Sequence, residues 1–265
     1  MTVDFAREWQ DWKTQRETGL ADPHGWLALV SLDWLEDAPR EYAGLPGRWW
    51  QDENAAYVDP SGGELLHDGR PITAVHRFEL VNSGAGTRVT AGDREIEIAR
   101  RSGYLIRVHD PKAPVLQAFR GVPSYEPDPG WVVSTRFEPF GSPRPTTVGA
   151  VVEGLSHVYT APGRVRFTRD GTEHTLTAFN GRNGGLTILF TDATSGVTTY
   201  AANRSLPVAA PSDSGTGSGT VTLDFNRAVN LPCAFTDFAT CPLPPEGNRL
   251  PFAVEAGEKV PYERA

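Results

Sequence analysis

The sequence lacks the short motifs that identify common enzyme classes. It contains no nucleophile elbow, no phosphate-binding loop and no zinc-ligand signature. None of its histidines has another histidine two or four residues away, the spacing that places metal ligands on one face of a strand or helix. These patterns therefore assign no metal and no other cofactor, and no reaction follows from them.

Positive charge and long apolar runs are also scarce. The chain has 25 lysines and arginines against 33 aspartates and glutamates, a net charge of −8. It therefore lacks the basic surface that phosphate backbones require, and we expect no nucleic-acid partner. No stretch approaches the length of a membrane span, and Met1–Phe5 shows no basic segment followed by an apolar run. We expect no membrane partner and a cytoplasmic protein.

Cysteine is limited to Cys233 and Cys241, which are too few for a disulfide scaffold. By contrast, the chain holds 22 prolines and 27 glycines, a composition typical of many short elements joined by turns. Its 265 residues, 39% of them hydrophobic, suffice for a large buried core. We predict a mainly β fold, an antiparallel β-sandwich or barrel with one N-terminal helix and a proline-rich C-terminal wrap.

The N-terminal helix is expected to be amphipathic. Phe5, Trp9 and Trp12 recur at helical spacing behind Asp4, which is a candidate N-cap. The apolar run over residues 25–35 then predicts a strand buried on both faces, with or without a short helical turn.

Turn dipeptides separate the strands that follow. Asp68-Gly69 and Asp170-Gly171 are hairpin-type dipeptides, and Gly92-Asp93 indicates another turn. The run Glu95–Ile98, just after Gly92-Asp93, alternates cleanly between polar and apolar residues. The proline-rich segment Pro139–Pro145 is the best candidate for a boundary. We therefore predict a single domain over residues 1–265, with possible sub-units 1–138 and 146–265.

The most distinctive segment runs from Asp224 to Lys259 and holds both cysteines. Prolines fix φ and remove backbone donors, so we expect this segment to be a stiff wrap that folds inward across the sheets. Such a segment forms either a site or a lid. Its recurring elements are Asp224-Phe225-Asn226-Arg227, Cys241-Pro242-Leu243-Pro244-Pro245 and Asn248-Arg249-Leu250.

His109, Asp110 and Cys233 are the candidate catalytic groups. His109 ends a predicted strand beside Asp110, but adjacent strand residues point to opposite faces, so a direct dyad is disfavoured and a structural histidine is the plainer interpretation. Cys233 and Cys241 would form a disulfide, supply thiolates to a metal or pack as small hydrophobes. The neighbouring sequence offers nothing that would activate either thiol.

Arginine and asparagine side chains dominate the candidate ligand-binding set. Guanidinium groups suit planar recognition of a carboxylate or phosphate. The plainer alternatives are internal ion pairs that pin the wrap to the sheet, and asparagines that cap turns. The set comprises Arg101, Arg107, Asn226, Arg227, Asn230, Cys241, Asn248 and Arg249.

A group of motifs spread along the chain adds a family resemblance. They are Gly25-Trp26-Leu27, Leu32-Asp33-Trp34-Leu35, Arg100-Arg101, Arg107 with Asp110, Asp192-Ala193-Thr194-Ser195-Gly196 with Thr199-Tyr200, and the Asp224–Lys259 segment. Together they resemble the bacterial and archaeal family known as domain of unknown function 1684. The resemblance extends over nearly the whole chain, and it implies no established activity.

Three functional hypotheses follow. The first is binding of a small anionic organic molecule in an apolar cleft closed by the C-terminal wrap, with Arg107, Arg227 and Arg249 holding the anionic group. The second is an enzyme, of hydrolase or of isomerase and cyclase type, that uses the same cavity and the candidate catalytic groups. The third is a protein-interaction module without a ligand. The sequence assigns no oligomeric state.

Overall fold

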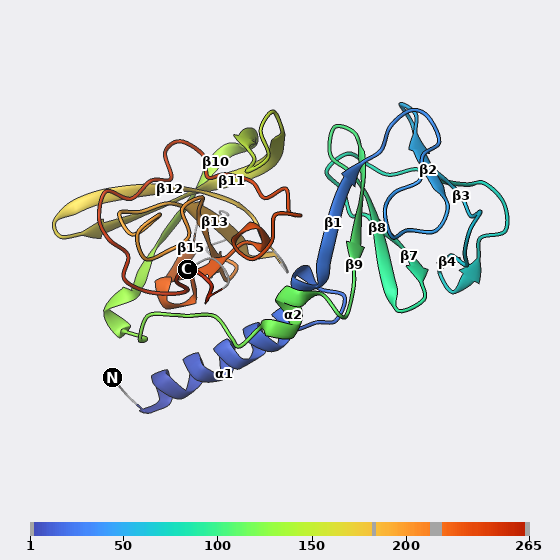
Figure 1. Ribbon diagram of the computed structural model, residues 1–265. Coiled ribbons are helices and arrows are strands. Elements are labelled where there is room, and N and C mark those ends of the chain that lie inside the picture. The colour runs from blue at the N-terminus through green and yellow to red at the C-terminus, as the bar shows by residue number, and fades with distance from the viewer. Residues whose placement is uncertain (1–2, 182–183, 213–218, 263–265) are drawn as a thin grey trace. The chain divides into compact units, whose positions relative to one another are not determined.

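The computed structural model describes residues 3–181, 184–212 and 219–262 (Figure 1). The chain forms two compact units. Unit 1 comprises Met1–Glu17, Gly121–Phe235 and Thr240–Ala265, and unit 2 comprises Thr18–Arg120 and Thr236–Ala239. The main division of the chain therefore lies near residue 120.

The N-terminal helix α1 spans Val3–Leu20 and confirms the helix predicted from the tryptophan spacing. Trp9 is buried, and its indole Nε1 donates to the backbone oxygen of Asn226 at 3.0 Å, which fixes the helix to the C-terminal segment of unit 1. Asp4 lies inside the first turn rather than before it, so its expected role as N-cap is not observed. A carboxylate in the first turn still interacts favourably with the helix dipole.

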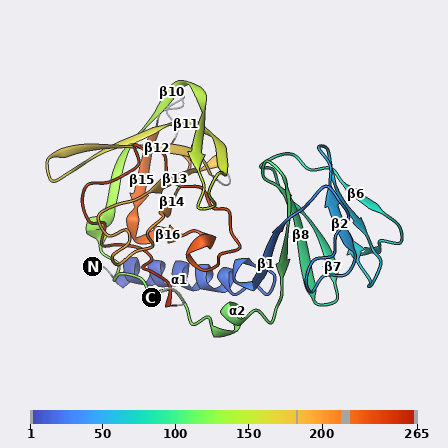
Figure 2. The same cartoon turned by 45° about the horizontal axis from the view of Figure 1, so that its top comes forward.

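Unit 2 is a two-sheet antiparallel sandwich. One sheet has the strand order β1-β9-β8-β7-β4-β5, and the other has the order β2-β3-β6. Figure 2 shows β1, β8 and β7 of the first sheet and β2 and β6 of the second. The strands are β1 (Leu29–Trp34), β2 (Arg48–Gln51), β3 (Ala56–Asp59), β4 (Leu66–His67), β5 (Arg70–Pro71), β6 (His76–Phe78), β7 (Thr87–Ala91), β8 (Arg94–Arg100) and β9 (Tyr104–His109). Two short helices accompany them, η1 (Trp26–Ala28) and α2 (Pro114–Ala118).

The core of unit 2 lies between these two sheets. Ile96 and Ile98 of β8 are fully buried in it, whereas Glu97 between them lies on the other face of the sheet. Trp49 of β2 and Phe78 of β6 contribute from the facing sheet, with ring centroids 6.4 Å apart. The alternation predicted for this part of β8 is confirmed.

The apolar run over residues 25–35 forms η1 followed by β1, so the strand is preceded by a short helical turn, which is one of the two expected arrangements. It is not buried on both faces, because Trp26 and Trp34 are 39% and 38% exposed. Register accounts for the exposure of Trp34, since Leu32 and Trp34 oppose Arg107 and Leu105 on the face of the sheet that lies away from the apolar core of unit 2.

The predicted turns are confirmed. Asp68 and Gly69 connect β4 to β5 with φ values of 50° and 72°, which is the all-positive geometry of a two-residue hairpin turn. Asp170 and Gly171 show the same geometry, with φ values of 49° and 76°. Gly92, between β7 and β8, has a φ of 65°.

Unit 1 is built on a seven-stranded antiparallel sheet with the order β15-β10-β11-β12-β13-β14-β16. Among the described residues its edge strands β15 and β16 do not pair with each other, so the sheet is open and sandwich-like rather than a closed barrel. Its elements are η2 (Pro129–Trp131), β10 (Val132–Gly149), β11 (Ser156–Arg169), β12 (Thr172–Asn180), β13 (Leu186–Phe190), β14 (Arg204–Val208), β15 (Gly219–Asp224), η4 (Phe225–Arg227), β16 (Val229–Asn230) and η5 (Pro232–Ala234).

The segment Pro139–Pro145, where the sequence suggested a boundary, lies inside β10. The pairing of β10 with β11 shifts register between Pro139 and Arg144. Prolines cannot donate to the ladder, so they favour such an irregularity within a strand. A proline-rich segment is typical of a linker between domains, but here it lies where the pairing of β10 with β11 is interrupted.

The C-terminal segment folds inward, as predicted, and completes the core of unit 1. Phe225, Leu250 and Val254 are each at most 2% exposed and belong to the same apolar cluster as the strands.

Among the described residues, no helix combines the length and the apolarity that crossing a bilayer would need.

Candidate functional site

The residues predicted to form the site belong to both units. Arg101, Arg107, His109 and Asp110 are in unit 2. The others are in unit 1, and they are Asn226, Arg227, Asn230, Cys233, Cys241, Asn248 and Arg249.

His109 and Arg107 share one carboxylate, that of Glu97 on the neighbouring strand. Arg107 Nη2 donates to Glu97 Oε1 at 2.7 Å, and His109 Nε2 lies 3.4 Å from Glu97 Oε2. The other ring nitrogen, Nδ1, lies 2.9 Å from the backbone oxygen of Gly25. Because both partners of the ring are acceptors, both contacts are hydrogen bonds only when the ring carries two protons.

The Arg107–Glu97–His109 group is almost closed to solvent. The side chains of Arg107 and His109 are 2% exposed and that of Glu97 is 14% exposed. Burial alone would raise the pKa of Glu97, but the hydrogen bonds and charges of His109 and Arg107 outweigh it and lower the pKa to about 2. The guanidinium of Arg107 also lies 5.0 Å from the ring centroid of Trp26. Every polar contact of this group fits a structural role.

Asp110 does not act on His109. Its Oδ2 accepts from Arg94 Nε at 2.7 Å and its Oδ1 accepts from the backbone N–H of Lys112 at 2.8 Å. The dyad disfavoured by strand alternation is indeed absent among the described contacts of these side chains. The carboxylate near His109 is instead Glu97, a candidate that the sequence did not identify.

The asparagines of the C-terminal segment hold the fold together. The Asn248 side chain accepts from the N–H of Thr177 and donates to the oxygens of Thr177 and Leu189, each at 2.8 Å. Asn226 accepts from the N–H of Asp128 and donates to the oxygen of that same residue, each at 2.9 Å. Their amides are therefore occupied within unit 1.

Asn230 is buried as well. Its Nδ2 donates to the backbone oxygen of Lys259 at 2.7 Å, and its backbone N–H donates to Glu258 Oε2 at 2.6 Å. Its Oδ1 is a buried acceptor that has no hydrogen-bond partner among the described residues. The amide thus ties β16 to the last part of the wrap.

The predicted arginines differ in their surroundings. Arg227 forms an ion pair with Asp224 at 3.1 Å, and its guanidinium lies 5.8 Å from the Trp12 ring. Arg101 Nη1 donates to two backbone oxygens, those of Gly84 and Arg100, at 3.1 and 2.8 Å. Arg249 is exposed, and the described residues offer its side chain no ion pair.

Cys233 and Cys241 are buried thiols that lie close together. The backbone N–H of Cys233 donates to Cys241 Sγ at 3.2 Å, and neither residue forms a disulfide. Across the described parts of the chain, no group of three or more His, Cys, Asp or Glu side chains could hold a metal ion. Of the three alternatives for these residues, the structure therefore corresponds to packing as thiols.

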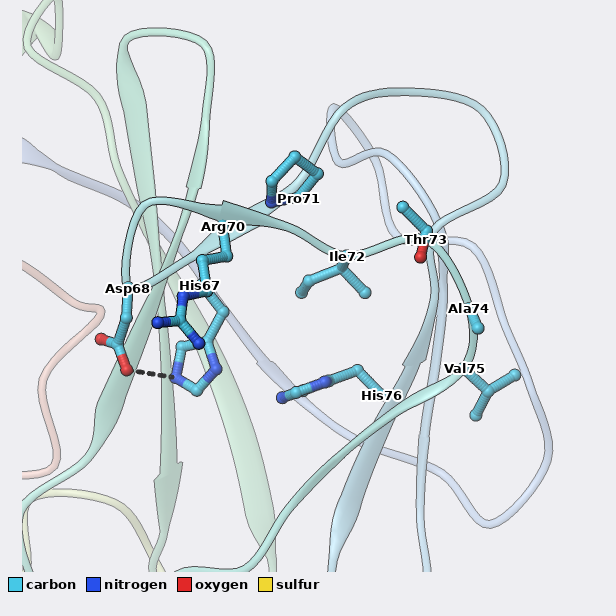
Figure 3. Close-up of a pocket in the computed structure, with 9 residues that line it drawn as sticks. All are labelled: His67, Asp68, Arg70, Pro71, Ile72, Thr73, Ala74, Val75 and His76. Carbon is cyan, nitrogen blue, oxygen red and sulfur yellow. Dashed lines mark ion pairs between the residues drawn. The ribbon is translucent and has the colours of Figure 1, made fainter.

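A pocket of about 600 Å³ lies in unit 2, and none of the predicted site residues lines it (Figure 3). Its lining consists of residues 67, 68 and 70–76, and we call it the histidine pocket. The β4–β5 hairpin belongs to one sheet of the sandwich and β6 belongs to the other. The chain thus crosses between the sheets along the pocket, and this crossing brings the rings of His67 and His76 into edge-to-face contact.

The two imidazoles contact each other and an aromatic ring. The centroids of His67 and His76 are 5.1 Å apart at 70°, and Phe78 lies 5.3 and 4.7 Å from them, respectively. His67 Nε2 lies 3.0 Å from Thr87 Oγ1 and 4.0 Å from Asp68 Oδ2. Figure 3 shows the His76 ring pointing toward His67.

His76 and Arg70 are polar side chains of the histidine pocket that lack hydrogen-bond partners within the described structure. Burial, and secondarily the positive charge of His67, lower the pKa of His76 below its usual value. Neither nitrogen of His76 has a hydrogen-bond partner in the described structure, and the same holds for the guanidinium of Arg70. The apolar part of the lining includes Pro71, Ile72 and Val75.

The sequence does not reveal this pocket, because its two histidines are not at helical or strand spacing. His67 and His76 are nine positions apart and come from different sheets. The Asp68-Gly69 turn and Pro71 were the available signals, since they show where the chain leaves one hairpin, but they do not show what the next strand faces.

A family described as "Protein of unknown function (DUF1684)" matches residues 117–259, more than half of the chain. The chain belongs to this family.

The part of the chain that matches the DUF1684 family lies mainly in unit 1 and contains both cysteines and the whole Asp224–Lys259 segment. The motifs at residues 25–35 and 100–110 lie outside the match, so the resemblance is shown over a shorter range than expected. The histidine pocket also lies outside it.

One solved structure similar to the chain is a solution NMR structure of an uncharacterized protein from Haloarcula marismortui. The two sequences are 30% identical, the similarity covers 54% of this chain and 78% of that chain, and the TM-score is 0.46. No curated protein matches the chain.

Proposed function

We propose that the protein binds a small organic anion in the histidine pocket. The observation that carries the proposal is Arg70, whose guanidinium lines the pocket without an ion pair or hydrogen bond to any described residue. A guanidinium is always charged at physiological pH and binds carboxylates and phosphates through parallel N–H donors. The anionic group of the ligand would take this position.

The other walls of the pocket suit the rest of such a ligand. Ile72 and Val75 supply apolar surface, and the two imidazoles supply polar atoms that hold an orientation. A volume of about 600 Å³ lies in the range of small-molecule sites, which combine apolar walls with a few polar groups. Asp68 is the one acidic side chain of the lining, and its carboxylate lies toward His67 at 4.0 Å (Figure 3).

The arginines named from the sequence support this function less well. Arg107 is committed to Glu97 and Arg227 to Asp224, so neither guanidinium is available without breaking an ion pair. No residue of the C-terminal segment lines the histidine pocket. The proposal keeps the expected ligand class and moves the site to unit 2.

The test uses three probes of this class: benzoate, hexanoate and phenyl phosphate. Binding is followed by the ring C–H resonances of the histidines in nuclear magnetic resonance spectra, and His67 and His76 are assigned from single variants. We expect at least one probe to shift both sets of resonances in a saturable manner. Benzyl alcohol, which has the ring but no charge, should not.

The matched variants are Arg70→Gln and Arg120→Gln. Both remove one exposed arginine of unit 2, but Arg120 does not line the pocket. A charge-assisted hydrogen bond contributes about 1.5–3 kcal/mol, so Arg70→Gln should weaken binding about tenfold or more while Arg120→Gln leaves it unchanged. If none of the three probes shifts either histidine, the proposal is wrong.

An enzyme that uses the same pocket is the second candidate. The observation that favours it is His76, whose ring nitrogens have no partner in the described structure and whose pKa is lowered by burial and by His67. Such an imidazole is unprotonated near neutral pH and able to accept a proton from a substrate or a water molecule.

The check on this candidate is hydrolysis of 4-nitrophenyl acetate. General-base catalysis contributes about 100-fold or more, so His76→Gln should lose most of any activity above the buffer rate. His174→Gln, a histidine variant in unit 1, is the matched control and should retain it. Equal rates for the wild-type protein and His76→Gln would contradict a catalytic role for His76.

A further inference from the structure

We infer that anion binding in the histidine pocket is coupled to uptake of a proton by the His67–His76 pair, so that affinity for the anion rises as the pH falls. The inference rests on the proposed function and adds to it a regulatory property of the same site. It predicts that the protein takes up its ligand in acidic conditions and releases it in alkaline ones.

The two imidazoles of the pair lie close together. With ring centroids 5.1 Å apart, two imidazolium charges would repel each other strongly, because the rings are partly removed from water. The pair therefore accepts its second proton only with difficulty, and its protonation steps belong to the pair rather than to one ring. The lowered pKa of His76 agrees with this geometry.

The charged groups of the β4–β5 hairpin do not compensate a positive charge on His76. The hairpin presents His67, Asp68 and Arg70. Asp68 is the only carboxylate among them, its side chain is 89% exposed, and it lies 4.0 Å from His67 rather than at His76. Arg70 adds positive charge. Protonation of His76 is thus opposed by the hairpin and not compensated by it.

The strands next to His76 offer no compensating charge either. His76 pairs with Val58 of β3, so alternation places the ionisable neighbours of both residues on the opposite face of the sheet. Those neighbours already have partners on that face. They are Asp59 with Arg48, Tyr57 with Asp52, and Arg77 with Glu79. From β7, the residue beside His67 is the neutral Thr87.

A bound anion would supply the missing negative charge. It would favour the protonated pair just as a neighbouring carboxylate does, and linkage then requires that protonation favour the anion equally. For one proton taken up, affinity changes by at most about tenfold per pH unit, and only over the range in which the free pair is unprotonated and the bound pair is protonated.

The experiment measures benzoate affinity by histidine ring resonances from pH 8 to pH 5.5, a range in which the benzoate carboxylate stays ionised. We expect affinity to be at least about fivefold higher at pH 5.5, as partial uptake of one proton requires. We also expect saturating benzoate to raise the pH at which the His76 resonance titrates. The whole chain is used throughout.

The variants are His76→Phe and His174→Phe. Phenylalanine keeps a ring against His67 and Phe78 but cannot take a proton, so His76→Phe should bind benzoate with a flatter pH dependence, whereas His174→Phe should retain the wild-type slope. If His76→Phe does not fold, the shift of the His76 titration in the wild-type protein still decides the question.

The outcomes separate the two proposals. Benzoate binding with the same affinity at pH 8 and pH 5.5, or with an unchanged His76 titration, would overturn proton coupling and leave the proposed function standing. If the affinity of His76→Phe for benzoate depends on pH as steeply as that of the wild-type protein, the coupled proton belongs to another group and the inference for this pair is wrong. Absence of binding at every pH, for benzoate and for the other two probes, would overturn both.

Discussion

Glu97 and Arg107 face each other directly across β8 and β9, and their side chains are joined by a 2.7 Å ion pair that is almost closed to solvent. Taking these charges out of water is costly, and the pair offsets that cost only while both members are present. His109 takes the second oxygen of the same carboxylate. Removing the carboxylate therefore takes a partner from both Arg107 and His109.

We predict that Glu97→Gln destabilises unit 2 strongly. The glutamine leaves Arg107 buried without its counter-charge, and loss of one member of a buried pair costs about 3–5 kcal/mol. Glu95→Gln is the matched control, because Glu95 lies on the same strand and pairs with Arg88 at a more exposed position, where the cost is about 1 kcal/mol or less. Urea unfolding of the three proteins measures the difference, and equal midpoints for the two variants would contradict it.

The same carboxylate predicts an acid-dependent loss of stability. The pKa of Glu97 is about 2 in the folded chain against 4.5 as its ordinary value, so the unfolded chain binds the proton more readily. The stabilisation is fully present above pH 4.5 and is lost as the pH falls from there toward 2, and it amounts to about 3 kcal/mol.

The measurement is the free energy of unfolding between pH 6 and pH 2.5 for the wild-type protein and for Glu97→Gln. The wild-type curve should fall more steeply below pH 4.5, because the variant has no carboxylate to protonate at this position. Parallel curves would mean that Glu97 titrates normally in the folded chain. Other carboxylates contribute equally to both proteins and cancel in the comparison.

Local patterns in the sequence predicted much of the fold but little of the site. Turn dipeptides such as Asp68-Gly69 and the alternation in β8 depend on a few neighbouring residues, so they were recognised correctly. The contact between Glu97 and His109 depends on strand register. Register pairs Glu97 with Arg107 and places His109 diagonally to it, and no single-residue pattern specifies that relationship.

The histidine pocket also could not be predicted from local sequence patterns. His67 and His76 meet because the chain crosses from one sheet to the other between them, which is a property of the tertiary fold. The sequence predicts that the Asp224–Lys259 segment folds inward, and its apolar residues do pack into the core of unit 1, while its stiffness stays a prediction. Its polar residues, however, mainly satisfy buried backbone groups, as irregular segments require.

Gly257 predicts a strict requirement for glycine in this segment. Its φ is 78°, and a Cβ at this position would lie 2.5 Å from the backbone oxygen of Ala228 and 2.8 Å from that of Phe225. Gly257→Ala should therefore cost about 2 kcal/mol or more, since the left-handed conformation and the backbone clash add. Thermal unfolding detects a loss of this size.

The control for Gly257 is Gly247→Ala. A Cβ on Gly247 meets nothing within 4 Å, and its φ is not positive. Alanine there also reduces the freedom of the unfolded chain, so stability should change by less than about 1 kcal/mol. A large loss in this variant, or none in Gly257→Ala, would show that the segment is not held as described.

Asn248 and Arg249 are adjacent residues whose replacement by alanine should change stability by very different amounts. The Asn248 amide makes three hydrogen bonds to Thr177 and Leu189 inside unit 1, whereas Arg249 is exposed. Asn248→Ala leaves buried backbone groups of β12 and β13 without partners and should cost about 3 kcal/mol or more, while Arg249→Ala should stay within about 0.5 kcal/mol. Urea unfolding, with hydrogen exchange of β12 and β13 amides, measures both. If Asn248 served a ligand rather than the fold, its loss would leave stability and exchange unchanged, because a side chain held in reserve for a ligand stabilises nothing in the ligand-free protein.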